Sequence, residues 1–162
     1  YLFGGFASYG NVDPGAGDDS NYWSAGLEGQ YYFDRTTVGA SLGYTKSDDA
    51  DLSATQLNVN ADYFVTDNFS VGGDVGFANI DAGTGDNADA WNAGVNAEYQ
   101  FASVPVSVFG AYEHVNIDDF DTDADTFSVG VRYNFGGETL IDRNRHGAGL
   151  KRTGLGSFLG LL

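Results

Sequence analysis

Apolar and polar residues alternate without a break along the segment Thr126–Phe135, TFSVGVRYNF. Its odd-numbered residues are all aromatic or valine, and its even-numbered residues are all small or polar. A period of two is typical of a β-strand that has one apolar face. The segment therefore predicts a strand with a polar side and an apolar side.

Seven earlier segments repeat this design. Each predicted strand is about ten residues long or slightly longer, which is the length of a tilted strand that spans a membrane. The eight predicted strands are Tyr1–Val12, Asn21–Phe33, Thr36–Ser47, Ser53–Val65, Phe69–Ile80, Trp91–Ala102, Val106–Ile117 and Thr126–Phe135. Two of them fit less well. The first has aromatic residues on both parities. The seventh changes parity between Tyr112 and Val115, which suggests either a bulge or the point at which the strand leaves the bilayer.

The connections between these strands alternate between short and long. Tight turns at 34–36, 66–68 and 103–105 join strands two to three, four to five and six to seven. The other connections are longer and acidic: DPGAGDDS, DDADL, DAGTGDNADA and DDFDTDAD. An even number of strands with short turns at one end and long loops at the other predicts an all-β, eight-stranded antiparallel up-and-down transmembrane β-barrel.

The composition of the two faces separates a membrane barrel from a soluble one. The polar parity is rich in Ser, Gly, Asn and Gln and holds no Lys, which suits a narrow lumen better than a solvated surface. On the apolar parity, aromatics gather at both strand ends and aliphatic residues lie between them. Two aromatic girdles around an aliphatic band match the two interfaces of a bilayer. A soluble ligand-binding barrel remains the alternative.

Overall composition excludes several classes of function. The net charge of −16 and the isoelectric point near 4.1 leave no basic footprint for nucleic acid. The absence of Cys excludes disulfides and thiolate metal sites, and no apolar run is long enough for a membrane helix. Because the chain opens on Tyr1 rather than Met, we expect that a leader has been removed.

Strand number, girdles, loop asymmetry and the terminal Val-Arg-Tyr-Asn-Phe resemble the small eight-stranded outer-membrane proteins, the OmpA transmembrane domain and OmpX class. The resemblance covers residues 1–137 and implies that Tyr133 and Phe135 form the signal that the barrel-assembly machinery reads. This chain departs from the family pattern because residues 138–162, a basic tail with several Gly and Leu, follow Phe135. The resemblance also implies contact with outer-membrane lipid and lipopolysaccharide.

Acidic residues concentrate in the long connections, which hold 14 of the 23 Asp and Glu residues. Asp119, Asp121, Asp123 and Asp125 form the densest group and are candidate ligands for Ca²⁺ or Mg²⁺. An EF-hand is excluded, because Ala124 stands where that loop needs Gly and Gly130 where it needs Glu. The alternative is a solvated acidic rim. No cofactor is otherwise required.

The predicted lumen carries more acids than bases. The side chains expected there are Arg132, Glu28, Asp62, Asp74, Glu98 and Glu113. Since a buried charge needs a partner, we expect Arg132 to pair with one or more of these acids. The network is either a gate across a small ion pathway or a structural plug that fills a narrow barrel.

Catalytic chemistry finds little support in the sequence. A nucleophile needs a base, and the two histidines are His114, among acids near the loop end, and His146 in the tail. We therefore predict that the protein is not an enzyme.

The tail is basic where the rest of the chain is acidic. Its four basic residues are Arg143, Arg145, Lys151 and Arg152, against Glu138 and Asp142. Eight up-and-down strands place both termini at the short-turn end, which we expect to be periplasmic. There the tail is a disordered extension, docks on a partner or the inner leaflet, or plugs the lumen.

These features predict an outer-membrane barrel of a Gram-negative-type envelope. The expected role is structural or adhesive, with the acidic loops presented outside. A narrow ion channel and a subunit of a larger envelope complex, docked through the tail, are the alternatives.

Overall fold

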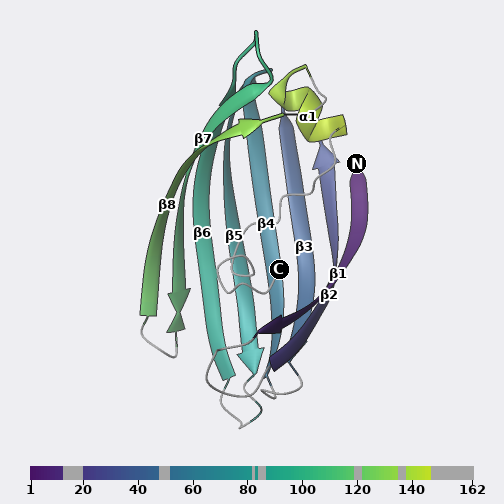
Figure 1. Ribbon diagram of the computed structural model, residues 1–162, viewed down its shortest axis with the longest axis vertical. Helices are drawn as coiled ribbons and strands as arrows, with labels where there is room; N and C mark the ends of the chain where they lie inside the picture. The colour runs from purple at the N-terminus through teal and green to yellow at the C-terminus, as the bar shows by residue number, and fades with distance from the viewer. Residues whose placement is uncertain are drawn as a thin grey trace.

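The described part of the chain folds into one antiparallel sheet of eight strands, followed by one short helix, α1, Leu140–His146 (Figure 1). The computed structural model describes residues 1–12, 20–47, 52–81, 83, 87–118, 122–134 and 138–146. The strands are β1 Leu2–Val12, β2 Ser20–Tyr32, β3 Thr36–Ser47, β4 Leu52–Thr66, β5 Phe69–Asp81, β6 Asn87–Gln100, β7 Val106–Ile117 and β8 Thr122–Tyr133.

The topology is up-and-down, as predicted, because each strand pairs with the next one in the chain. The connections β2–β3, β4–β5 and β6–β7 are short and lie at the same end, which is at the top in Figure 1 and is called here the short-turn end. The predicted boundaries of two strands were wrong: β6 runs from Asn87 to Gln100, and β8 runs from Thr122 to Tyr133. Asp89, Asp123 and Asp125 therefore belong to strands rather than to loops.

The sheet is inverted relative to a water-soluble domain, because its polar face is buried and its apolar face is exposed. Buried polar side chains on β2 to β7 include Ser24, Thr45, Asn58, Asn92 and Ser107. Leu27, Leu42, Leu57, Val75 and Val95 of the other face are exposed. This arrangement is expected when lipid surrounds the sheet and the polar side lines a lumen. It contradicts the alternative of a soluble barrel with an apolar interior.

Aromatic pairs mark both edges of the apolar band. At the short-turn end, the rings of Tyr31 and Phe33 lie 4.9 Å apart and those of Tyr99 and Phe101 lie 5.4 Å apart. The opposite end is called here the loop end. There the ring centroids of Trp23 and Tyr44 lie 5.6 Å apart, and those of Tyr112 and Phe127 lie 4.8 Å apart. These pairs form the two girdles that the sequence predicted.

The strands with irregular parity keep a continuous register. On β7, which was expected to change parity, pairing with β6 runs unbroken from Ile117 to Ser107. Val115 lies on the polar face, where it packs with Ala78 and Ala90 in a small buried cluster. The apparent change in parity therefore arises because an apolar residue, Val115, lies on the lumen side of β7 near the loop end. The pairing of β7 with β6 contains no bulge.

The sheet order begins with β1 and ends with β8. Within the described residues, the pairings run from β1–β2 to β7–β8, and none joins β8 to β1. The two end strands also lie apart in Figure 1. Val129 of β8 is 90% exposed, so the outer face of this edge is open.

Helix α1 lies at the short-turn end, beside the turns (Figure 1). The backbone N–H of Ile141 donates to the carbonyl of Asp67 in the β4–β5 turn, at 3.0 Å. Leu140, the first residue of the helix, is buried. In the part of the chain that is described, no helix has the length and apolar character needed to cross a membrane.

Candidate functional site

The polar face of the sheet, called here the lumen face, carries all six of the predicted lumen charges. Glu28, Asp62 and Glu98 are buried, whereas Asp74, Glu113 and Arg132 are partly or largely exposed. Strand register decides which of these side chains meet, because side chains of one parity line up across neighbouring strands.

Five side chains at the short-turn end form a connected group, called here the Glu98 cluster: Glu98, Ser107, Arg132, Asn134 and Arg143. Arg132 Nη1 donates to Glu98 Oε2 at 2.7 Å, and Arg143 Nη2 donates to Glu98 Oε1 at 2.8 Å. Ser107 Oγ also donates to Glu98 Oε1. Asn134 accepts from Arg143 and donates to Ser107 Oγ. The pairing expected for Arg132 thus occurs with Glu98.

The β6–β7–β8 register assembles this cluster. Ser107 pairs with Arg132 across β7 and β8, and Glu98 pairs with Phe109 across β6 and β7. Gly130 faces Phe109, and a Cβ on Gly130 would lie 2.6 Å from the phenyl ring. Glycine at this position leaves room for the ring, and the Arg132 guanidinium stacks over that ring at 4.9 Å.

Helix α1 contributes to the same end of the lumen. Arg143 reaches Glu98, and Asn144 Oδ1 accepts a hydrogen bond of 2.6 Å from the buried Thr37 of β3. Arg145 donates to the carbonyls of Phe33 and Asp34 in the β2–β3 turn. The helix therefore links β3 and the β2–β3 turn to β6 at the short-turn end. Residues 138–146 thus lie against the lumen face, whereas residues 147–162 lie outside the described residues.

A second polar group lies farther along the lumen and joins three strands. Asn92 of β6 donates from Nδ2 to Asp74 Oδ2 of β5 at 3.2 Å and to Glu113 Oε1 of β7 at 3.3 Å. Asp74, Glu98, Glu113 and Arg132 all line a cavity of about 260 Å³. The cavity thus connects this group to the Glu98 cluster.

The remaining lumen acids occupy other strands. Glu28 is on β2, and Asp62 is on β4 with its Oδ1 only 2.2 Å from the position of a Cβ on Gly72. Neither acid belongs to the hydrogen bonds of the Glu98 cluster. The expected single network is therefore divided, and Arg132 has one carboxylate partner in the described lumen.

Of the four candidate metal ligands, Asp119 and Asp121 lie outside the described residues. Asp123 and Asp125 lie on β8, where Asp125 Oδ1 accepts from Tyr112 at 2.7 Å and contacts His114 Nδ1 at 2.9 Å. Among the described residues, no three His, Cys, Asp or Glu side chains are grouped to hold a metal ion. Asp125 is thus part of a polar extension of the sheet beyond the girdle.

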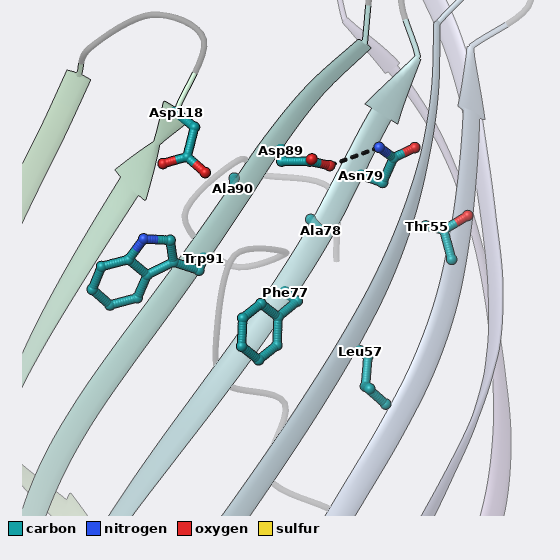
Figure 2. A pocket seen from close by; sticks show the side chains of 9 residues that line it. All are labelled: Thr55, Leu57, Phe77, Ala78, Asn79, Asp89, Ala90, Trp91 and Asp118. Carbon is teal, nitrogen blue, oxygen red and sulfur yellow. Dashed lines mark hydrogen bonds between the residues drawn. The ribbon is translucent and has the colours of Figure 1, made fainter.

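A hollow of about 500 Å³ lies at the loop end, between β4 and β7. Figure 2 shows the rings of Phe77 and Trp91 below Asp89 and Asn79, and Asn79 Nδ2 donates to Asp89 Oδ1 at 2.7 Å. Aromatic rings below and carboxylates above match the boundary between lipid and headgroups. We therefore interpret the hollow as part of the girdle.

Of the remaining predicted site residues, Tyr133 ends β8 and is exposed. Phe135, Lys151 and Arg152 lie outside the described residues. Sequence reasoning did not assign Ser107 and Asn134 to the charge network. Their signal was their position on the polar parity beside Arg132: Asn134 follows Arg132 by two residues, and Ser107 pairs with Arg132 across β7 and β8.

Comparison with known proteins places these features in a wider class. The sequence pattern that defines one family, Gram-negative porin, matches residues 1–143. No curated protein is similar enough to be matched.

Solved outer-membrane proteins share the fold. A loop-L8 deletion mutant of OmpT, an outer membrane protein of Vibrio cholerae, gives a TM-score of 0.61 at 20% identity over 81% of this chain and 47% of that chain. In-vitro folded OmpT of the same organism gives 0.60 at 19% identity, over 81% and 50%. A porin refined at 1.8 Å gives 0.53 at 22% identity, over 83% and 48%. The chain thus spans about half the length of these proteins.

Proposed function

The chain belongs to the Gram-negative porin family, and from this premise we propose that it is an outer-membrane barrel whose lumen is held shut at the short-turn end. Its role is structural, and it presents acidic loops at the cell surface beside lipopolysaccharide. The main support for this proposal is the hydrogen bond of 2.8 Å from Arg143 Nη2 of α1 to Glu98 Oε1 on the lumen face. Family membership also favours a channel or structural role over an enzymatic one.

The Glu98 cluster explains why the lumen stays shut. Moving α1 away would separate Arg143 from Glu98, Asn144 from Thr37 and Arg145 from the β2–β3 turn. The Arg143 and Glu98 side chains are 21% and 10% exposed, and Glu98 keeps Arg132 when α1 moves, so we expect opening to cost about 2–3 kcal/mol, less than the loss of a fully buried pair. A cost of that size corresponds to an open fraction of roughly 1–3%.

A narrow cation pathway is the second candidate. Five acids, Glu28, Asp62, Asp74, Glu98 and Glu113, occupy the lumen face with Arg132. Rings or rows of acidic side chains favour the passage of cations. In this alternative, the Glu98 cluster is the gate rather than a permanent plug.

Conductance in planar lipid bilayers separates the two candidates. If the lumen is shut, the wild-type protein is silent, whereas Arg143→Ala and a variant lacking residues 138–162 conduct. If the protein is a channel, the wild type conducts cations, and Arg132→Ala or Glu98→Gln changes its selectivity. Arg35→Ala, which alters an exposed turn residue, is the matched control. Silence in every variant would contradict α1 as the element that closes the lumen.

We infer that both termini and the short turns face the periplasm, that Tyr133 and Phe135 serve the barrel-assembly machinery, and that the tail docks on an envelope partner through Lys151 and Arg152. We also infer a particular likeness to the OmpA transmembrane domain and OmpX class, from the eight strands and the closing Val-Arg-Tyr-Asn-Phe. Binding of Ca²⁺ or Mg²⁺ at the acidic loops supports adhesion by bridging to lipopolysaccharide.

A further inference from the structure

The hollow of about 500 Å³ at the loop end is bounded by aromatic side chains on the outer face of the sheet. Phe77 of β5 and Trp91 of β6 pair in register, and their side chains are 60% and 36% exposed. Leu57 of β4 pairs with Phe77 in the same row and is also exposed. Two rings are therefore accessible from the lipid side of the sheet.

Two carboxylates line the same hollow on the side of the loops. Asp89 precedes Trp91 by two residues, and its Oδ1 accepts a hydrogen bond of 2.7 Å from Asn79 Nδ2. Asp118 follows the last residue of β7. Figure 2 shows Asp89 and Asp118 above the two rings. The hollow thus combines an aromatic part with an acidic rim.

No positive side chain balances this rim from inside the hollow. Among the described residues that line it, none is Lys, Arg or His. The His114 ring lies 5.2 Å from the Trp91 ring, but His114 Nδ1 contacts Asp125 at 2.9 Å, and neither of these two residues lines the hollow. The charge of the hollow is therefore complementary to a cation.

An organic ammonium group fits both parts of this hollow. Aromatic rings, Trp above all, attract ammonium groups, and carboxylates attract the same charge. The next row toward the short-turn end is aliphatic and consists of Val59, Val75 and Ala93. We propose that the hollow binds the ammonium headgroup of a phospholipid whose acyl chains lie along this row. The lipid site is independent of whether the lumen is shut.

The fluorescence of Trp91 can report which lipid occupies the hollow. In the variant Trp23→Phe, Trp91 is the one remaining tryptophan of the chain. Brominated acyl chains quench a tryptophan that they touch. The variant is reconstituted with EDTA in phosphatidylglycerol vesicles that contain brominated phosphatidylethanolamine or, for comparison, brominated phosphatidylglycerol. We expect phosphatidylethanolamine to be preferred about three- to tenfold at Trp91, the sum of an exposed cation–π contact and an exposed ion pair.

The second tryptophan supplies the matched control. Trp23 belongs to the same girdle, but it pairs in register with Lys46 rather than lying beside an acidic rim. In Trp91→Phe, where Trp23 is the reporter, phosphatidylethanolamine should have no advantage. Adding Asp89→Asn and Asp118→Asn to Trp23→Phe should abolish the preference at Trp91 while both lipids still quench it.

Several results would overturn the proposal. Equal quenching of Trp91 by the two lipids would show that the hollow does not select a headgroup. A preference of the same size at Trp23, or one that survives the loss of both carboxylates, would show that the acidic rim is not the cause. A shift of Trp91 emission with free ethanolamine, without any lipid preference, would assign the hollow to a soluble amine. Failure of both lipids to quench Trp91 would contradict contact with the membrane itself.

Discussion

At the scale of single residues, Glu98 is the negative charge at which the two arginines of its cluster meet. Its carboxylate accepts from Ser107, Arg132 and Arg143. We expect Glu98→Gln to lower the free energy of unfolding by about 2–3 kcal/mol, because it leaves two guanidinium groups without a counter-charge. The loss stays below that of a fully buried pair, since the Arg132 side chain is 48% exposed. Urea unfolding in lipid vesicles measures it.

Asp67→Asn is the control for this prediction. Asp67 pairs with Arg35 at 3.4 Å in exposed turns, where an ion pair contributes little. We expect a change of less than about 0.5 kcal/mol. Equal losses in the two variants would mean that burial adds nothing to the Glu98 pair.

Glycine at position 76 is required by the packing of the lumen. Its strand neighbours Asn58 and Asn92 extend over it, and their Oδ1 atoms lie 2.3 and 2.1 Å from the position of a Cβ. We expect Gly76→Val to cost about 1–3 kcal/mol through overpacking. In Gly110→Ala, the new Cβ meets its nearest atom at 3.8 Å, so its effect should be within about 0.5 kcal/mol. Thermal unfolding in detergent compares the two, and equal stabilities would contradict a packed lumen.

At the scale of elements, helix α1 depends on the sheet for its place. It has seven residues, too few to be stable alone, and its Leu140 is 2% exposed. We expect Leu140→Ala to cost roughly 2–3 kcal/mol of docking energy. Trypsin should then cleave after Arg143 and Arg145 much faster than in the wild type, while the sheet stays intact. Ile141→Ala, which changes a less buried neighbour, should be cleaved more slowly than Leu140→Ala.

Strands were easier to predict than the helix for a physical reason. The alternation in β8 and the tight turn at 66–68 are local, so they predict a face and a register without any partner. Asp123 and Asp125 were assigned to a loop because charged residues disfavour strands, but pairing with β7 continues through them. Helix α1 needs Glu98 and Thr37, which lie far away in sequence. No local pattern encodes those contacts.

At the scale of the whole molecule, the length of the chain and the packing of its lumen bear on the size of the barrel. The chain covers about half the length of the solved outer-membrane proteins that it resembles. In a barrel of about sixteen strands, the lumen holds water and its side chains are wet. Here Ser24, Asn92 and Gln100 are almost fully buried on the lumen face. Side chains that fill the lumen are typical of a barrel of about eight strands.

We therefore predict that β8 pairs with β1 when the protein is in a membrane. Eight up-and-down strands make β1 and β8 antiparallel, so their free edges are complementary. Val131→Cys on the outer face of β8 should form a disulfide, upon oxidation in lipid, with one member of a panel of outward-facing cysteines on β1. The panel replaces, one at a time, Phe3, Gly5, Ala7 and Tyr9.

The cross-link should form within one molecule. Pairing of β8 with β1 brings two strands of the same chain together, and a disulfide requires their Cα atoms to lie within about 7 Å of each other. It should change the gel mobility of the denatured monomer without doubling its mass. Val131→Cys combined with Val38→Cys on the outer face of β3 is the control and should remain reduced, since several strands separate the two positions in the sheet order. Cross-links that join two molecules throughout the panel would mean that a second copy supplies the missing edge and that the barrel is larger than eight strands.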